Sequence, residues 1–278
     1  MLEEKFLSEL LDDIYHNRLI LPTLPEVALK VRKVIDDPNA TAAQIAKVVA
    51  TDVALSVRLI HVANSPLLRG RTVVDNLQTA IARLGNVLVR NLVTGLVMEQ
   101  LHQARTPLLK ARLTVLWQHS TQVAAISHVL ATHFTKLKPD EAMLGGLIHD
   151  IGALPILARA EKVPELMADK EALDRIIVHL HTQVGKAILQ AWNFPSELVS
   201  VVAEHEDTDR DKAPEADYTD VVLVANLQSY INSTHPHSNA DWEHIPALAK
   251  LGLSPEVSIV TMEETAEDVQ EVQRLLTS

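Results

Sequence analysis

The chain of 278 residues contains no cysteine. This absence excludes disulfide bonds, thiolate metal ligands and a cysteine nucleophile.

Long apolar runs are also missing. No run approaches the roughly 20 residues of a membrane span, and the start, Met1–Lys5, lacks the basic and apolar regions of a signal peptide. The composition, 47% apolar and 22% charged with only 8 glycines, is that of an ordinary globular protein. We expect a cytoplasmic protein with no membrane segment and one large core or two modest ones.

The net charge of −11 argues against a broad nucleic-acid surface, but the charge is unevenly distributed. Residues 58–112 contain two acids, Asp75 and Glu99, and eight basic residues: Arg58, Arg69, Arg71, Arg83, Arg90, Arg105, Lys110 and Arg112. A solvated face that balances acidic segments elsewhere is the preferred interpretation of this excess. The alternative is a surface for an anionic ligand, such as a nucleotide, or for an acidic partner.

Apolar residues recur at helical spacing along almost the whole chain, for example at Leu55, Leu59 and Val62. Breakers such as Asn64-Ser65-Pro66 separate these stripes. The best strand candidate is the short run Val221–Val224. The pattern predicts an all-α fold.

A break at Thr106-Pro107 suggests two parts. We expect an N-terminal helical subdomain over residues 1–112. A second helical bundle would follow over residues 113–278, ending in an acidic tail from Ser254.

The pair His149-Asp150 lies inside an otherwise apolar, helix-like segment. Burying a carboxylate without a partner costs several kcal/mol. A metal, another cation or a dense set of hydrogen bonds is therefore expected beside Asp150.

Other polar side chains also lie on apolar helical stripes. His119, for example, shares a face with Val123 and Ile126. A single inward histidine is more often a core residue that is satisfied by hydrogen bonds. Several on separate helices favour one shared site, whose candidate members are His119, His149, Asp150, His181, His205, Glu206 and Asn226.

Imidazole and carboxylate ligands suit iron, manganese or zinc better than calcium, so one or two such divalent ions are expected. Two ions about 4 Å apart could clamp the attacking and leaving oxygens of a phosphoester hydrolysis.

The other histidines fit this site less well. His128 lies on the opposite side of its helix from His119, and His133 lies about 20 Å along the same helix. His235-Pro236-His237 has ligand-type spacing, but a solvated loop explains it.

The chain resembles HDOD proteins, relatives of the HD phosphohydrolases, over roughly residues 18–230. In the first half the motifs are Leu21–Pro25, Asp37-Pro38, Thr51-Asp52, Val62–Ser65 and Ala80–Gly85. In the second half they are Trp117–Ser120, His149–Gly152, His181–Gly185, Trp192–Pro195 and His205-Glu206. The resemblance implies a multi-helix HD-like bundle with an N-terminal helical subdomain.

The resemblance also implies roles for the candidate residues. One metal would be held by His119, His149, Asp150 and Asn226, and a second by His181, His205 and Glu206. Asp150 would be the catalytic residue of an active enzyme.

The chain departs from the active HD pattern at several positions. Active HD enzymes have Asp at the position of Asn226 and His at the position of Glu206. They often have Lys at the position of Ala153, directly after the His-Asp-x-Gly motif. The Gly-Tyr-Pro loop of cyclic-di-GMP phosphodiesterases is absent between His181 and His205.

These features predict a bacterial signal-transduction module that acts through a signalling protein partner and has a degenerate metal site. The alternative is a metal-dependent phosphohydrolase of low or no activity, acting on a nucleotide or phosphodiester. A third reading, nucleic-acid binding, rests on a helix-turn-helix cadence over Thr41–Lys47 and Val53–Val62. Its second helix offers only Arg58 and His61, which argues against it.

Overall fold

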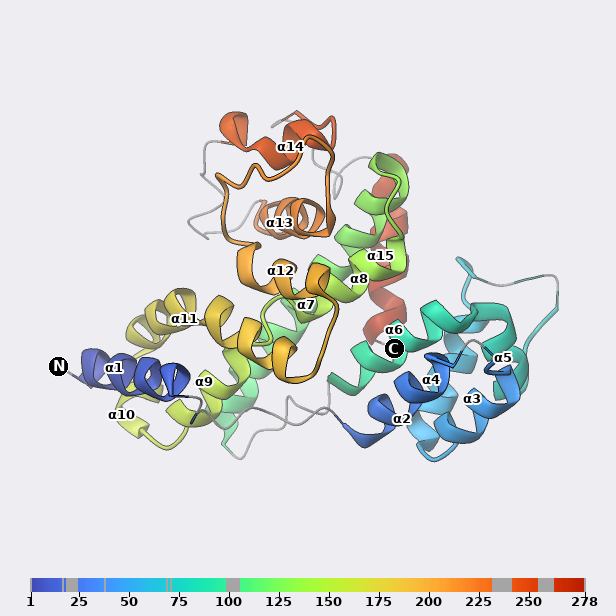
Figure 1. Ribbon diagram of the computed structural model, residues 1–278, viewed down its shortest axis with the longest axis horizontal. Helices are drawn as coiled ribbons and strands as arrows, with labels where there is room; N and C mark the ends of the chain where they lie inside the picture. Colours follow the sequence, from blue (N-terminus) through green and yellow to red (C-terminus); the bar gives the residue numbers. More distant parts are fainter. Residues whose placement is uncertain are drawn as a thin grey trace.

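The computed structural model describes residues 2–16, 18, 25–37, 39–68, 70, 72–98, 106–231, 242–254 and 263–277. Within these ranges every regular element is a helix, and none is a strand, so the all-α prediction is confirmed (Figure 1). The run Val221–Val224, which was the best strand candidate, lies within a helix.

Six helices form the first part of the chain. They are α1 (Leu2–Tyr15), α2 (Glu26–Ile35), α3 (Ala42–Val49), α4 (Val53–Ala63), α5 (Leu77–Leu84) and α6 (Asn86–Met98). Helices α2 to α6 pack on one another, whereas α1 packs on α11 in the second part (Figure 1).

Several motif residues of this first part stabilise the ends of its helices and the loops between them. Asp52 caps α4 by accepting from the Leu55 N–H at 3.0 Å. Asn64 exchanges two hydrogen bonds with the backbone of Val74, at 2.7 and 2.8 Å. Gly85 ends α5 with a φ of 78°, a conformation that favours glycine. Of the resembling motifs, residues 21–24 and Pro38 lie outside the described ranges.

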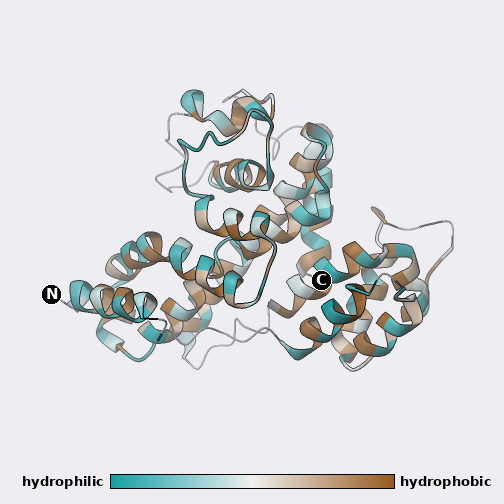
Figure 2. Cartoon of the chain, in the orientation of Figure 1, coloured by the Kyte–Doolittle hydropathy of each residue, from teal (hydrophilic) through white to brown (hydrophobic). Residues whose placement is uncertain are grey.

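The second part is built around α7. Its helices are α7 (Pro107–Phe134), α8 (Pro139–Ile148), α9 (Ala153–Ala160), α10 (Pro164–Ala168), α11 (Lys170–Ala191), α12 (Ser196–Glu204), α13 (Tyr218–Ser229), a 3-10 helix (Trp242–His244), α14 (Pro246–Lys250) and α15 (Glu263–Thr277). Helices α8, α13 and α15 all pack on α7. Hydrophobic and hydrophilic residues alternate around the helix axes, as amphipathic helices require (Figure 2).

Several contacts join the two parts. The Arg58 guanidinium donates to the Leu276 carbonyl at 2.6 Å, and the Leu67 N–H donates to the Glu271 carboxylate at 2.6 Å. The predicted boundary between residues 112 and 113 lies inside α7. The two-subdomain division therefore remains a prediction, and α1, α7 and α15 connect its halves.

One stretch, Pro139–Ala160, is long and apolar enough to cross a membrane by composition, but 83% of it is buried inside the protein. Helices Leu77–Leu84 and Asn86–Val97 would be long and apolar enough to cross a membrane only as one continuous span, but the chain bends by 111° between them. Among the described residues this is the pattern of core helices, because α8 packs along α7.

Gly152 allows the turn after α8 to lie against α11. A Cβ atom at this position would lie 1.9 Å from the His181 carbonyl oxygen and 2.5 Å from the Gly185 nitrogen. The requirement is one of space, since the φ of Gly152 is an ordinary −67°. This close approach brings Asp150 toward His181.

We therefore expect Gly152→Ala to lower the free energy of unfolding by about 3 kcal/mol, because the backbone itself must move. Chemical denaturation checks this value. Gly145→Ala is the matched control: its Cβ would meet only side chains, the nearest being Val222 at 3.3 Å. The control should change stability by less than about 1 kcal/mol. Equal effects of the two substitutions would contradict the argument.

Candidate metal centre

The end of α8 carries His149 and Asp150 into the interior. His149 is fully buried, and its Nδ1–H donates to the Gly146 carbonyl oxygen at 2.7 Å. With the proton on Nδ1, the Nε2 atom keeps a lone pair that points into the site. This is the orientation of a metal-ligating histidine.

Two further histidines follow the same pattern. His181 on α11 donates from Nδ1 to the Ile177 carbonyl at 2.8 Å, and His205 at the end of α12 donates from Nδ1 to the Val201 carbonyl at 3.2 Å. In each case the acceptor lies four residues earlier on the same helix. Local helix geometry thus leaves Nε2 free to face the centre.

The Asp150 carboxylate lies between two pairs of imidazoles. Its Oδ2 atom is 3.4 Å from Nε2 of His149 and 3.7 Å from Nε2 of His119 on α7. Its Oδ1 atom is 3.4 Å from Nε2 of both His181 and His205. One carboxylate therefore serves two separate groups of nitrogen atoms, and could bridge two ions.

Within each pair the nitrogens are close together. The Nε2 atoms of His119 and His149 are 3.2 Å apart, and those of His181 and His205 are also 3.2 Å apart. Two lone pairs at this distance repel unless a proton or a cation lies between them. The ligand atoms of each three-residue group, His119–His149–Asp150 and Asp150–His181–His205, lie within 4.8 Å of one another.

Asn226 on α13 and Glu206 complete the site. The Asn226 amide donates to the Glu206 carboxylate at 3.4 Å, and Glu206 is 3.8 Å from Nε2 of His205. The Asn226 Oδ1 atom is buried and makes no hydrogen bond of ordinary geometry among the described residues, although the Asn226 amide interacts with His119. An unpaired buried acceptor costs about 1–3 kcal/mol. A cation beside it would remove that cost, so the donor set fits a metal.

Tyr230 is a site residue that the sequence analysis did not assign. Its hydroxyl is 3.3 Å from Nε2 of His119, and the two rings stack at 5.2 Å with an interplanar angle of 17°. Burial raises the pKa of Tyr230, so the phenol stays neutral and can donate to His119. Its spacing of four residues from Asn226, on the same helical face, was the available signal.

Burial and charge set the protonation states. Burial lowers the pKa of His149 to about 3, and it also lowers the pKa of His119 against the opposing charge of Asp150. Burial alone would raise the pKa of Asp150, but the surrounding histidines, foremost His149, hold it well below its usual value. Asp150 is thus ionised while His119 and His149 are neutral. Metal binding requires these states.

The pKa of His205 shifts in the opposite direction to those of His119 and His149. Burial lowers its pKa, but the hydrogen bond to Asp150 and the charge of that carboxylate outweigh burial, so the pKa is raised. A proton on His205 would have to leave when a cation binds, since a ligating imidazole must be neutral.

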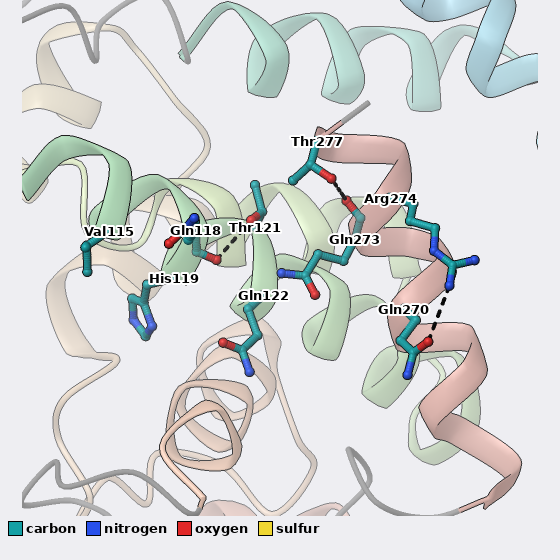
Figure 3. A pocket seen from close by; sticks show the side chains of 9 residues that line it. All are labelled: Val115, Gln118, His119, Thr121, Gln122, Gln270, Gln273, Arg274 and Thr277. Carbon is teal, nitrogen blue, oxygen red and sulfur yellow. Dashed lines mark hydrogen bonds between the residues drawn. The ribbon is translucent and has the colours of Figure 1, made fainter. Parts of the chain in front are cut away.

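Two hollows reach the centre. A cavity of about 1010 Å³ is lined by Asp150, Glu171, Asp174, Arg175, Ile177, Val178, His179, His181, Glu206 and Tyr230. A groove of about 610 Å³ lies between α7 and α15 beside His119. In this groove Gln273 projects from α15 toward α7, and none of the described residues that line it is a carboxylate (Figure 3). Of these two hollows, the larger cavity touches Asp150 and, from the second histidine pair, His181.

All seven candidate residues from the sequence meet at this centre. The two other histidines of α7 do not join it: His128 is 3.8 Å from Asp140, and His133 is 3.2 Å from Asp268. His235 and His237 lie outside the described residues.

The described arginines of the basic region do not form an anion site of their own. Arg58 and Arg83 donate to backbone carbonyls, and Arg90 and Arg112 pair with Glu141 and Asp174 at 2.6 and 2.7 Å. These four guanidinium groups have intramolecular partners. Arg69, Arg71 and Arg105 lie outside the described residues.

Comparisons with solved structures place this fold. A protein of Shewanella amazonensis SB2B, proposed to be a metal-dependent phosphohydrolase, is 29% identical with a TM-score of 0.86, and the match covers 99% of both chains. A proposed signal transduction protein of Marinobacter aquaeolei VT8 is 18% identical with a TM-score of 0.67, covering 99% of this chain and 66% of that one. The second likeness concerns the fold alone.

Among curated sequences, an uncharacterized protein of Treponema pallidum (strain Nichols) is 23% identical over 203 residues, which is 66% of this chain. The chain spans only 37% of the length of that relative. The model of the HDOD domain matches residues 21–208, more than half of the sequence. The chain belongs to the HDOD domain family.

Proposed function

We propose that the protein is a regulatory module of bacterial signal transduction that binds two divalent metal ions around Asp150. One observation carries the metal assignment: the two oxygens of a single ionised carboxylate face two separate imidazole pairs, with Oδ2 3.4 Å from His149 and Oδ1 3.4 Å from both His181 and His205. Nitrogen and carboxylate ligands favour iron, manganese or zinc.

Each ion would have its own ligands and share Asp150. The first would be held by His119, His149, Asp150 and Asn226, and the second by Asp150, His181, His205 and Glu206. When bound, such ions act as Lewis acids and lower the pKa of water. The helix carbonyls that accept from Nδ1 keep the imidazoles oriented, and Tyr230 holds His119 by stacking.

The signalling role rests on the family and on exposed surface in the first part. Val53 and Val57 on α4 are 75% and 62% exposed, and Val73 is 86% exposed. Val53 and Val57 are four residues apart and so share one face of α4, and exposed apolar side chains suit a protein partner. The M. aquaeolei structure, proposed to be a signal transduction protein, points the same way. A cytoplasmic setting and a signalling protein partner are part of this proposal.

A second candidate function is phosphoester hydrolysis, with a nucleotide or phosphodiester as the anionic substrate. The observation that favours it is the cavity of about 1010 Å³ that reaches Asp150, His181 and Glu206. Asp150 would be the catalytic residue, since it would touch both ions. Asn226 and Ala153 weaken this candidate, because each removes a charged group that the active HD pattern contains.

Metal analysis tests the main proposal. Protein purified without chelator should contain two divalent ions per chain, and Asp150→Ala should contain none. Removing the ions should lower Tm, because a ligand at 100 times its Kd stabilises by about 2.7 kcal/mol. Asp174→Asn is the matched control, since this carboxylate lines the same cavity but pairs with Arg112. A chain without metal, and with a chelator-insensitive Tm, would contradict the proposal.

Asn226→Asp should act in opposite directions with and without metal. The new carboxylate gives the first ion a charged ligand, so metal affinity should rise about tenfold. Without metal it adds a buried charge near Asp150 and Glu206, so the Tm of the chelated protein should fall. Calorimetric titration and thermal melts measure the two effects. A variant with unchanged affinity would show that Asn226 is not a ligand.

Turnover of a generic phosphodiester such as bis-(p-nitrophenyl) phosphate separates the two functions. The second candidate requires metal-dependent release of nitrophenol that is lost in Asp150→Asn. Protein that holds two ions but gives no turnover with manganese, iron or zinc would remove the hydrolase and leave the metal-binding module.

A further inference from the structure

The second half of the metal centre depends on how α11 and α12 lie relative to each other. α11 carries His181, and His205 follows the last residue of α12. Their Nε2 atoms are 3.2 Å apart, so a small rotation of either helix would separate them. The two helices are joined directly by the turn at residues 192–195.

This turn is a Schellman motif. Asn193 has a φ of 51°, and its N–H donates to the Gln190 carbonyl at 3.0 Å. The Phe194 N–H donates to the Leu189 carbonyl at 3.0 Å, and Pro195 then begins α12. The motif satisfies earlier carbonyls of α11, but those of Trp192 and Asn193 point beyond the helix end.

Arg32 of α2 binds these two carbonyls. Its Nη1 donates to the Trp192 oxygen at 3.0 Å, and its Nη2 donates to the Asn193 oxygen. The guanidinium carbon is 5.2 Å from the centre of the Phe194 ring. The planar guanidinium group can donate to two adjacent carbonyls and stack on an aromatic ring at the same time, whereas the single ammonium group of a lysine cannot. The positive charge also lies at the negative end of the 22-residue helix α11.

The arginine belongs to the first part of the chain. α2 packs with α3 and α6, which do not contribute to the metal centre. The opposite pair, His119 and His149, comes from α7 and the end of α8, which are not joined by this turn. Arg32 thus contacts the turn that joins the helices of the His181–His205 half directly, whereas α2 reaches His149 only through α6, which packs on α8.

We propose that Arg32 is a positioning residue through which the N-terminal helices set the His181–His205 half of the metal centre. The proposal rests on the proposed metal-binding function and adds its regulation. A partner that binds the N-terminal helices and shifts α2 would alter the affinity of the second ion and leave the first ion in place.

The experiment compares three variants of the full chain. Arg32→Ala removes the fork, Arg32→Lys keeps the charge alone, and Arg83→Ala is the matched control. Arg83 also binds two backbone carbonyls, those of Ala63 at 3.1 Å and Thr72 at 2.6 Å, but within the N-terminal helices. Each chelated protein is titrated with Mn²⁺ by calorimetry, and its metal-free Tm is measured.

We expect Arg32→Ala to bind the first ion normally and the second at least about tenfold more weakly, as for loss of other groups that orient ligands. Arg32→Lys should fall between it and the wild type. Arg83→Ala should lower Tm without changing either affinity. Normal binding of both ions by Arg32→Ala would overturn the proposal, as would equal weakening in Arg83→Ala. If Arg32→Ala does not fold, Arg32→Lys gives the decision.

A second measurement separates this inference from the proposed function. Hydrogen exchange over residues 177–205 of the metal-free proteins should be faster in Arg32→Ala and unchanged in Arg83→Ala. A wild type that binds no metal ends the proposed function, and exchange then decides whether Arg32 holds α11 and α12. Unchanged exchange in Arg32→Ala would overturn the positioning role.

Discussion

The ionised carboxylate of Asp150, partly buried among four imidazoles, is the constraint on which this structure depends. Four imidazoles from α7, α11 and the ends of α8 and α12 converge on it, so these helices must keep their mutual positions. A buried charge is tolerated only when partners compensate it. The histidines lower the pKa of Asp150, and their convergence on it also brings their Nε2 atoms together in pairs that need a cation or a proton between them. The arrangement that compensates the charge of Asp150 is therefore also the arrangement that would bind a metal.

Much of the fold and of the centre could be predicted from the sequence, because helical spacing is a local signal. His119, His181 and His205 each lie on an apolar stripe, and placing them inward was enough to group them with His149 and Asp150. The subdomain boundary was a different case: α7 runs through it, and α1 packs across on α11, a long-range contact that no local pattern contains.

Other features depend on tertiary contacts alone. The stacking of Tyr230 on His119 joins residues 111 positions apart, and the fork of Arg32 on Trp192 joins residues 160 apart. The excess of basic residues in 58–112 can be counted in the sequence, but the partners of these side chains cannot be predicted from it. Its described arginines mostly bind carbonyls and carboxylates of neighbouring helices, so charge counted along a chain did not predict an exposed cationic surface.

Gly152 has a consequence for how relatives of this chain are recognised. Its place is imposed by the backbone of α11, 1.9 Å from where a Cβ would lie, and not by any ligand. The segment His149–Gly152 therefore meets two unrelated requirements, the proposed ligands at its start and the helix approach at its end. A lineage that abandons the metal is free to vary the histidine and aspartate but must keep the glycine. In a related sequence, a glycine at this position would then indicate a shared fold, and only the residues matched to His149 and Asp150 would indicate a metal site.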